Sequence, residues 1–169
     1  MELPLLQPPK LTPDQVARFH QEMDHVLPRF PGHWKQAAML PALHLMQEMI
    51  GYLTPEAMLL VAKKLEVSPE KVAEVATFYV MFRLNPVGKY HIEVCTNLSC
   101  SLRGAEHVVE QLQAKLGIGL GETTPDGKFS LREVECLASC GTAPCLQVNE
   151  EFFENLTPHA VEQIVGSLS

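Results

Sequence analysis

The segment YHIEVCTNLSC, from Tyr90 to Cys100, contains the pattern that decides the fold. Its first half alternates apolar and polar residues, which predicts a half-buried β-strand. That strand leads directly into Cys95, and a short loop of small and polar residues then closes at Cys100. A cysteine at the end of a strand, paired with another one loop later, is typical of a site that holds an inorganic group.

A second pair of cysteines follows a second predicted strand. The segment CLASC, Cys136 to Cys140, comes just after an alternating stretch at Phe129–Val134. Four residues separate Cys95 from Cys100, thirty-five separate the two pairs, and three separate Cys136 from Cys140. Structural zinc sites and thioredoxin-type redox motifs favour two-residue spacings, which do not occur here. The spacing of plant-type ferredoxins is absent too.

Two loose pairs suit a wide group better than a single metal ion. A [2Fe–2S] cluster holds two iron atoms, so each loop can supply one iron with two thiolates. Small residues beside the cysteines let backbone N–H groups approach the sulfur atoms of an anionic cluster. The spacing therefore favours an iron–sulfur cluster, with structural zinc as the alternative. These small residues are Asn97, Ser99, Ser101, Gly104, Ala138, Ser139, Gly141 and Thr142.

Outward from these motifs, residues 1–85 have a helical pattern. Three Thr-Pro or Ser-Pro starts place an N-cap before a proline at the first helical position. Pro41 is expected to kink the second helix or to mark its true first turn. The pattern predicts an N-terminal four-helix bundle. Its helices are expected from Thr12 to about Phe30, from about Trp34 to Ile50, from Thr54 to about Leu65, and from Ser68 toward the segment TFYVMF.

Residues 86–169 change to a mixed pattern after the turn signal Asn85-Pro86-Val87-Gly88. The order of strand, helix, strands and helix predicts a thioredoxin-like α/β layer with both cysteine pairs just beyond strand ends. The fold class is therefore α/β, with a helical bundle in front. Beyond the two strands already named, the expected elements are a helix at about Leu102–Leu116, strands at Leu146–Val148 and in EEFFEN, and a helix from Thr157 to about Leu168.

The composition disfavours several classes of function. The formal net charge is −7, which disfavours binding to nucleic acid or anionic lipid. No apolar run approaches the length of a membrane span, and the first residues have no signal-peptide pattern, so a soluble cytoplasmic protein is expected. The segment GIGLGE, Gly117 to Glu122, follows a helix rather than a strand. We interpret its glycines as helix-stop and turn residues, so no nucleotide site is expected in this chain.

Several motifs together resemble a known family. They are GKYHIEVCTNLSC (88–100), LGIGLGETTPDGKFSLREVECLASCGTAPCLQVN (116–149), LTPHAVEQIV (156–165) and EVATFYVMF (74–82). They resemble the thioredoxin-like [2Fe–2S] subunit of the NADH-dehydrogenase module of respiratory complex I, the E-subunit family of NADH:quinone oxidoreductase. The resemblance implies that Cys95 and Cys100 bind one iron of the cluster and that Cys136 and Cys140 bind the other.

The resemblance also implies partners and a role. The family's partner is a flavoprotein subunit that binds FMN and NADH and carries a [4Fe–4S] cluster, within the peripheral arm of complex I. The [2Fe–2S] cluster is expected to exchange one electron with that FMN during NADH oxidation. NADH delivers two electrons together whereas such clusters accept one at a time, so a second acceptor near the flavin has a physical use. Such a complex is peripheral to the inner face of the bacterial plasma membrane.

Two other functions stay open. The same module occurs as the diaphorase subunit of NAD-linked hydrogenases and formate dehydrogenases. A structural zinc domain that acts as an interaction module is the remote alternative.

The fifth cysteine, Cys145, departs from the family, which usually has an aliphatic residue there. Pro144 restricts Ala143 to extended backbone, which is expected to carry the chain away from the cysteine loop and into a strand. Cys145 is therefore predicted to be a small buried apolar residue rather than a ligand.

Overall fold

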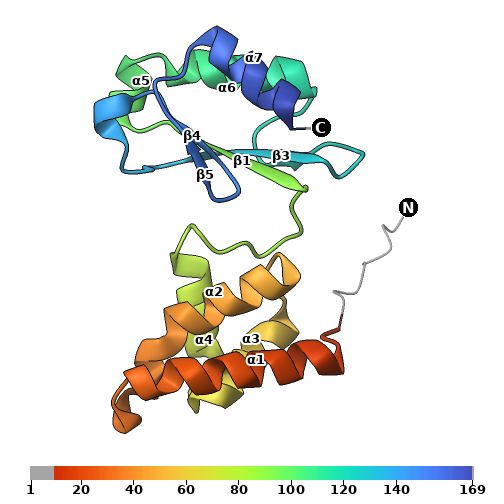
Figure 1. The fold of residues 1–169 in the computed structure, drawn as a ribbon, viewed down its shortest axis with the longest axis vertical. Coiled ribbons are helices and arrows are strands. Elements are labelled where there is room, and N and C mark those ends of the chain that lie inside the picture. Colours follow the sequence, from red (N-terminus) through yellow and green to blue (C-terminus); the bar gives the residue numbers. More distant parts are fainter. Residues whose placement is uncertain (1–9, 169) are drawn as a thin grey trace. The chain divides into compact units, whose positions relative to one another are not determined.

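The computed structural model describes residues 10–168. The chain separates into two compact units, the first ending at Pro86 and the second beginning at Val87 (Figure 1). In the part of the chain that the structure describes, no helix has both the length and the apolar character needed to cross a membrane.

The first unit is helical, and capping residues set the starts of three of its helices. The hydroxyls of Thr12, Thr54 and Ser68 each accept a hydrogen bond from a backbone N–H in the first turn, and a proline follows each of them. One apolar core joins the helices. They are α1 (Pro13–Val26), α2 (Met39–Ile50), α3 (Pro55–Leu65) and α4 (Pro69–Phe78), with 3-10 helices at Leu27–Arg29 and Gly32–Ala38.

The second predicted helix begins later than expected. The segment from Gly32 to Ala38 is a 3-10 helix in which Trp34 has non-helical backbone angles, φ −120° and ψ 34°. The α-helix α2 begins at Met39, so Pro41 lies in its first turn. A proline is tolerated there because its missing N–H would have no partner inside the helix. The helix-like apolar spacing before Met39 therefore does not predict α-helix here, and Trp34 is 57% exposed.

The second unit is a five-stranded sheet in the order β2-β3-β1-β4-β5. Strands β1 and β3 are parallel and the other neighbours are antiparallel. Helices α6 and α7 lie together on one face of the sheet (Figure 1). The elements are β1 (Tyr90–Cys95), α5 (Leu98–Leu102), α6 (Ala105–Leu116), β2 (Glu122–Thr123), β3 (Phe129–Val134), a 3-10 helix (Cys140–Thr142), β4 (Leu146–Val148), β5 (Glu151–Phe153) and α7 (Pro158–Ser167).

The helix predicted at about Leu102–Leu116 is α6, which begins at Ala105, and a short helix that was not predicted, α5, precedes it. Gly104 between them has φ +91°, a left-handed conformation that separates the two helices. The short helix α5 carries Cys100, whereas the longer α6 supplies apolar side chains to the core of the unit. The break therefore lets the cysteine loop take a direction different from that of the packing helix.

A polar pair aligns β1 with β3 on the sheet face opposite Ile92. Glu93 lies beside Arg132 in the parallel register, and Arg132 Nε donates to Glu93 Oε1 at 2.8 Å. Burial raises the pKa of the Glu93 carboxyl, but the nearby His91 and Arg132 together hold it below its ordinary value. Glu93 is therefore a charged partner for Arg132 at neutral pH.

Gly88 leads into β1 at a place where no side chain fits. A Cβ on this residue would lie 2.7 Å from the carbonyl carbon of Phe129 and 2.9 Å from its nitrogen. The Gly88 N–H also donates to Ser130 Oγ at 2.6 Å. We expect Gly88→Ala to lower the free energy of unfolding by about 1–3 kcal/mol, the usual cost of overpacking, measured by urea denaturation.

The matched control is Gly166→Ala in α7, where an added Cβ would meet nothing within 4 Å. This change is expected to be neutral or to stabilise by about 0.5–1 kcal/mol, because alanine favours helix over glycine. Equal effects of the two substitutions would contradict the tight approach of Gly88 to β3.

Candidate functional site

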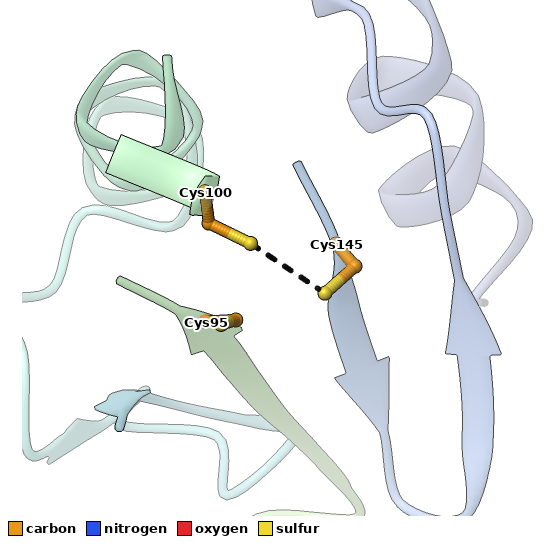
Figure 2. Close-up of side chains that lie close together, drawn as sticks. All are labelled: Cys95, Cys100 and Cys145. Atoms are coloured by element: carbon orange, nitrogen blue, oxygen red, sulfur yellow. Dashed lines mark hydrogen bonds between the residues drawn. The ribbon is translucent and has the colours of Figure 1, made fainter. Parts of the chain in front are cut away.

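Three buried cysteines meet at one edge of the sheet. Cys95 ends β1, Cys100 lies in α5, and Cys145 directly precedes β4 (Figure 2). Their sulfur atoms all lie within 4.8 Å of one another, and the Sγ atoms of Cys100 and Cys145 are 3.8 Å apart. The three residues are 2%, 1% and 0% exposed. The small residues Ala105 and Ala143 belong to the same buried cluster, and the partly buried Leu137 packs against it.

Local hydrogen bonds hold the first cysteine loop. The Asn97 side chain accepts a hydrogen bond from the Leu98 N–H at 2.8 Å and caps α5. One turn later, Ser101 Oγ donates to the carbonyl of Thr96 at 3.0 Å. A five-residue helix is too short to be stable alone. These side-chain bonds therefore set the direction in which Cys100 enters the site.

The sulfur atoms differ in how easily they ionise. Burial raises the pKa of Cys95, but hydrogen bonds from the backbone N–H groups of Asn97 and Leu137, together with its two thiol neighbours, bring that pKa below its ordinary value. Burial and the neighbouring Cys95 raise the pKa of Cys100. Burial also raises the pKa of Cys145. Cys95 is therefore the thiol of this group that is best prepared to act as an anionic ligand.

The second predicted pair, Cys136 and Cys140, lies on an exposed loop after β3. Among the described residues, neither sulfur belongs to the group of three. The loop nevertheless begins beside that group, because the Cys95 thiol donates to the carbonyl of Glu135 at 3.8 Å. Within the loop, the backbone N–H of Ala138 donates to the sulfur of Cys136 at 3.3 Å.

Hydroxyl groups tie the far end of this loop to the residue that follows strand β5. Ser139 Oγ and Thr142 Oγ1 both donate to the Glu154 carboxylate. The two hydrogen bonds, from Ser139 first and Thr142 second, lower the pKa of Glu154. Cys140 follows Ser139 directly, so the loop is anchored on both sides of this cysteine while the residue itself stays exposed to solvent.

The position of Cys145 corrects a prediction. Ala143 is extended, with φ −63° and ψ 150°, and Cys145 is buried, both as expected. The chain does run from the cysteine loop into a strand, but the prediction did not foresee that this strand brings Cys145 to Cys95 and Cys100. Strand β4 pairs antiparallel with β1 through Leu146 and Val94, and the Cys95 N–H donates to the Cys145 carbonyl at 3.2 Å. That register sets Cys145 opposite Cys95.

Only the antiparallel register of IEV with LQV locates Cys145, and local sequence patterns do not determine that register. The interpretation of GIGLGE is confirmed. Gly117 is the left-handed C-cap of α6, with φ +69°, and Gly121 precedes β2 with φ +81°.

The geometry of the first pair fits thiolate ligands of one metal. Sulfur atoms about 2.3 Å from a tetrahedral metal lie about 3.8 Å from each other. Cys95 and Cys100 lie within 4.8 Å, so small side-chain movements reach that separation. Backbone N–H groups of Asn97, Leu137 and Ala138 point at sulfur, which is the donor set that stabilises an anionic iron–sulfur cluster.

Comparisons with known proteins show the family of this chain. The family described as thioredoxin-like [2Fe–2S] ferredoxin matches residues 23–169. The E-subunit of NADH-quinone oxidoreductase from Rickettsia felis is 43% identical over 147 residues, which cover 86% of this chain and 88% of that protein. The corresponding protein of Mycobacterium tuberculosis is 39% identical over 161 residues, covering 95% of this chain. The chain spans 63% of the length of that mycobacterial relative.

A solved structure supports the fold. A chain of an NAD⁺-reducing [NiFe]-hydrogenase in its H₂-reduced state superposes with a TM-score of 0.68 over 78% of this chain and 22% of that chain. At 21% sequence identity this likeness concerns the fold alone. The family match and the curated relatives together identify the chain as a member of the thioredoxin-like [2Fe–2S] ferredoxin family, in the group that includes the E-subunit of NADH-quinone oxidoreductase.

Proposed function

We propose that the chain is the [2Fe–2S] electron-transfer subunit of an NADH:quinone oxidoreductase and exchanges one electron with the FMN of a partner flavoprotein. The observation that supports this most is the buried Cys95 and Cys100 pair at the sheet edge, with a second pair on the adjoining loop. Relatives with about 40% identity are named as subunits of that oxidoreductase.

The proposed ligands are Cys95 and Cys100 for one iron and Cys136 and Cys140 for the other. When bound, the cluster supplies a one-electron carrier. The residues of the chain hold and tune it: burial of the first pair excludes water, and the backbone N–H groups near the sulfurs stabilise negative charge. The exposed second pair leaves the other side of the cluster near the surface, where an electron can be exchanged with a partner.

The proposed partner is a flavoprotein subunit that binds FMN and NADH and carries a [4Fe–4S] cluster, within the peripheral arm of complex I. This assembly would lie in the cytoplasm against the inner face of the bacterial plasma membrane. Leu98 and Leu102 on α5 are 71% and 79% exposed and flank Cys100 in the sequence. Exposed apolar residues beside a redox site favour a protein partner there.

A second candidate keeps the same site but changes the assembly. The chain would then be the diaphorase subunit of an NAD-linked hydrogenase or formate dehydrogenase. The likeness of its fold to a chain of an NAD⁺-reducing [NiFe]-hydrogenase is the observation in favour of this candidate. The remote alternative, a structural zinc module, would need four thiolates around one ion.

We further propose that residues 1–85 and 86–169 act as separate domains, the first a four-helix bundle that serves as an annex. Each has its own apolar core. The described residues of the first contain none of the five cysteines.

The cluster itself can be measured. Purified without oxygen, the chain is expected to be reddish-brown, with about two iron and two sulfide per chain, as one [2Fe–2S] cluster requires. A low-temperature EPR signal is expected only after reduction, because the oxidised pair of irons has no net spin. A colourless protein with one zinc per chain would contradict the cluster and favour the zinc alternative.

The ligand set makes a second prediction. Cys140→Ser is expected to lose most of the bound iron, since a thiolate ligand is replaced by a hydroxyl group that ionises poorly. Cys145→Val is the matched control, because it removes a cysteine sulfur from the same segment but no proposed ligand. The measurement is iron per folded chain. Retention of iron in Cys140→Ser together with its loss in Cys145→Val would replace Cys140 by Cys145 in the set.

The proposed separation of roles between this chain and the flavoprotein leads to a third prediction. The isolated chain is expected not to oxidise NADH, because its glycine-rich segment is a helix stop and turn rather than a nucleotide site. Combined with the flavoprotein, it is expected to form a tight complex that reduces ferricyanide with NADH. NADH turnover by the isolated chain would place the active site here instead.

A further inference from the structure

Cys145 is the one cysteine that the proposed ligand set does not include, yet it lies next to Cys100. Its sulfur is 3.8 Å from Cys100 Sγ and is fully buried (Figure 2). This distance lies within the range of hydrogen bonds between sulfur atoms. A coordinated cysteine is a thiolate and has no hydrogen to donate. With Cys100 bound to iron, the proton between the two sulfurs must belong to Cys145.

We propose that the Cys145 thiol donates a hydrogen bond to the Cys100 ligand and thereby raises the reduction potential of the cluster. This inference rests on the proposed function. Hydrogen bonds to the sulfur ligands are one of the factors that set the potential of an iron–sulfur cluster. The donor stabilises the reduced cluster more than the oxidised one, because reduction adds a negative charge that the ligand sulfurs share.

The surroundings of Cys145 favour this role over a purely structural one. No water competes for the donor, since all three sulfurs are buried. A buried hydrogen bond is stronger than an exposed one. The position of Cys145 is determined by the backbone: its carbonyl accepts the Cys95 N–H, and β4 begins at the next residue. The thiol is therefore held at Cys100 by the sheet.

The backbone also offers a way to isolate the side chain. The Cys145 carbonyl accepts the Cys95 N–H, and this bond does not depend on the side chain. Cys145→Val therefore removes the S–H donor while keeping the backbone in position. Cys145→Ser restores a side-chain donor of similar size. Val148→Ala in β4 is the packing control, because Val148 is buried in the core of the unit and belongs to a different apolar cluster.

The first test is a redox titration of the full chain, followed by EPR. In Cys145→Val the potential is expected to fall, so that the ratio of reduced to oxidised cluster at a fixed solution potential drops roughly two- to tenfold, as loss of one hydrogen bond implies. Cys145→Ser and Val148→Ala are expected to stay near the wild-type potential. A wild-type potential in Cys145→Val, with full iron content, would overturn the inference and leave the proposed function intact.

The second test observes the proton directly. The chain has five cysteines, so a cluster with four ligands leaves a single S–H group. Its infrared stretching band is expected in the wild type, absent from Cys145→Val, and shifted to lower frequency when the cluster is reduced. A band that does not respond to reduction would overturn the inference. Loss of iron in Cys145→Val would show that Cys145 is a ligand, whereas a wild-type chain without a cluster would overturn the proposed function itself.

Discussion

The parallel pairing of β1 with β3 is the constraint on which the site depends. Six residues of each strand are in register, and the last pair is Cys95 opposite Val134. Because parallel strands end at the same edge of a sheet, the loop after Cys95 and the loop that begins at Glu135 leave from one place. Two cysteine pairs that are thirty-five residues apart in the chain thus become neighbours without any contact between the pairs themselves.

The antiparallel strand β4 completes the site from the other side of β1. It brings Cys145 against Cys100 and closes the apolar surroundings of the first pair with Ala143. One half of the site is therefore formed by the sheet and is shielded from water. The other half is a surface loop that is anchored through Glu154. The buried half of the site, with Cys95 and Cys100, is therefore positioned by the sheet, and the exposed loop with Cys136 and Cys140 is the side open to solvent.

Sequence patterns predicted the elements whose signals are local. The capped starts at Thr12, Thr54 and Ser68, the strand β1 and the cysteine pairs need only neighbouring residues. The expectation that β1 is half-buried is wrong, because its polar residues His91 and Glu93 are buried as well. The late start of α2 was missed because Trp34 has apolar spacing typical of a helix but adopts a 3-10 segment with a kink. The position of Cys145 was missed because it depends on strand register, which joins residues about fifty apart in the chain. Local propensity carries no information about such pairings.

The helix α5 links the chemistry of the site to its surface. Leu98 and Leu102 are four residues apart and both expose their side chains, whereas Cys100, between them, is buried. Residues four apart lie on the same helix face, so the exposed leucines and Cys100 occupy opposite sides of one helix. A partner that docks on the leucines is then about one helix diameter, 10–12 Å, from the Cys100 sulfur. Substitutions at Leu98 and Leu102 can therefore change the outer face of α5 while leaving Cys100 and Cys145 in place.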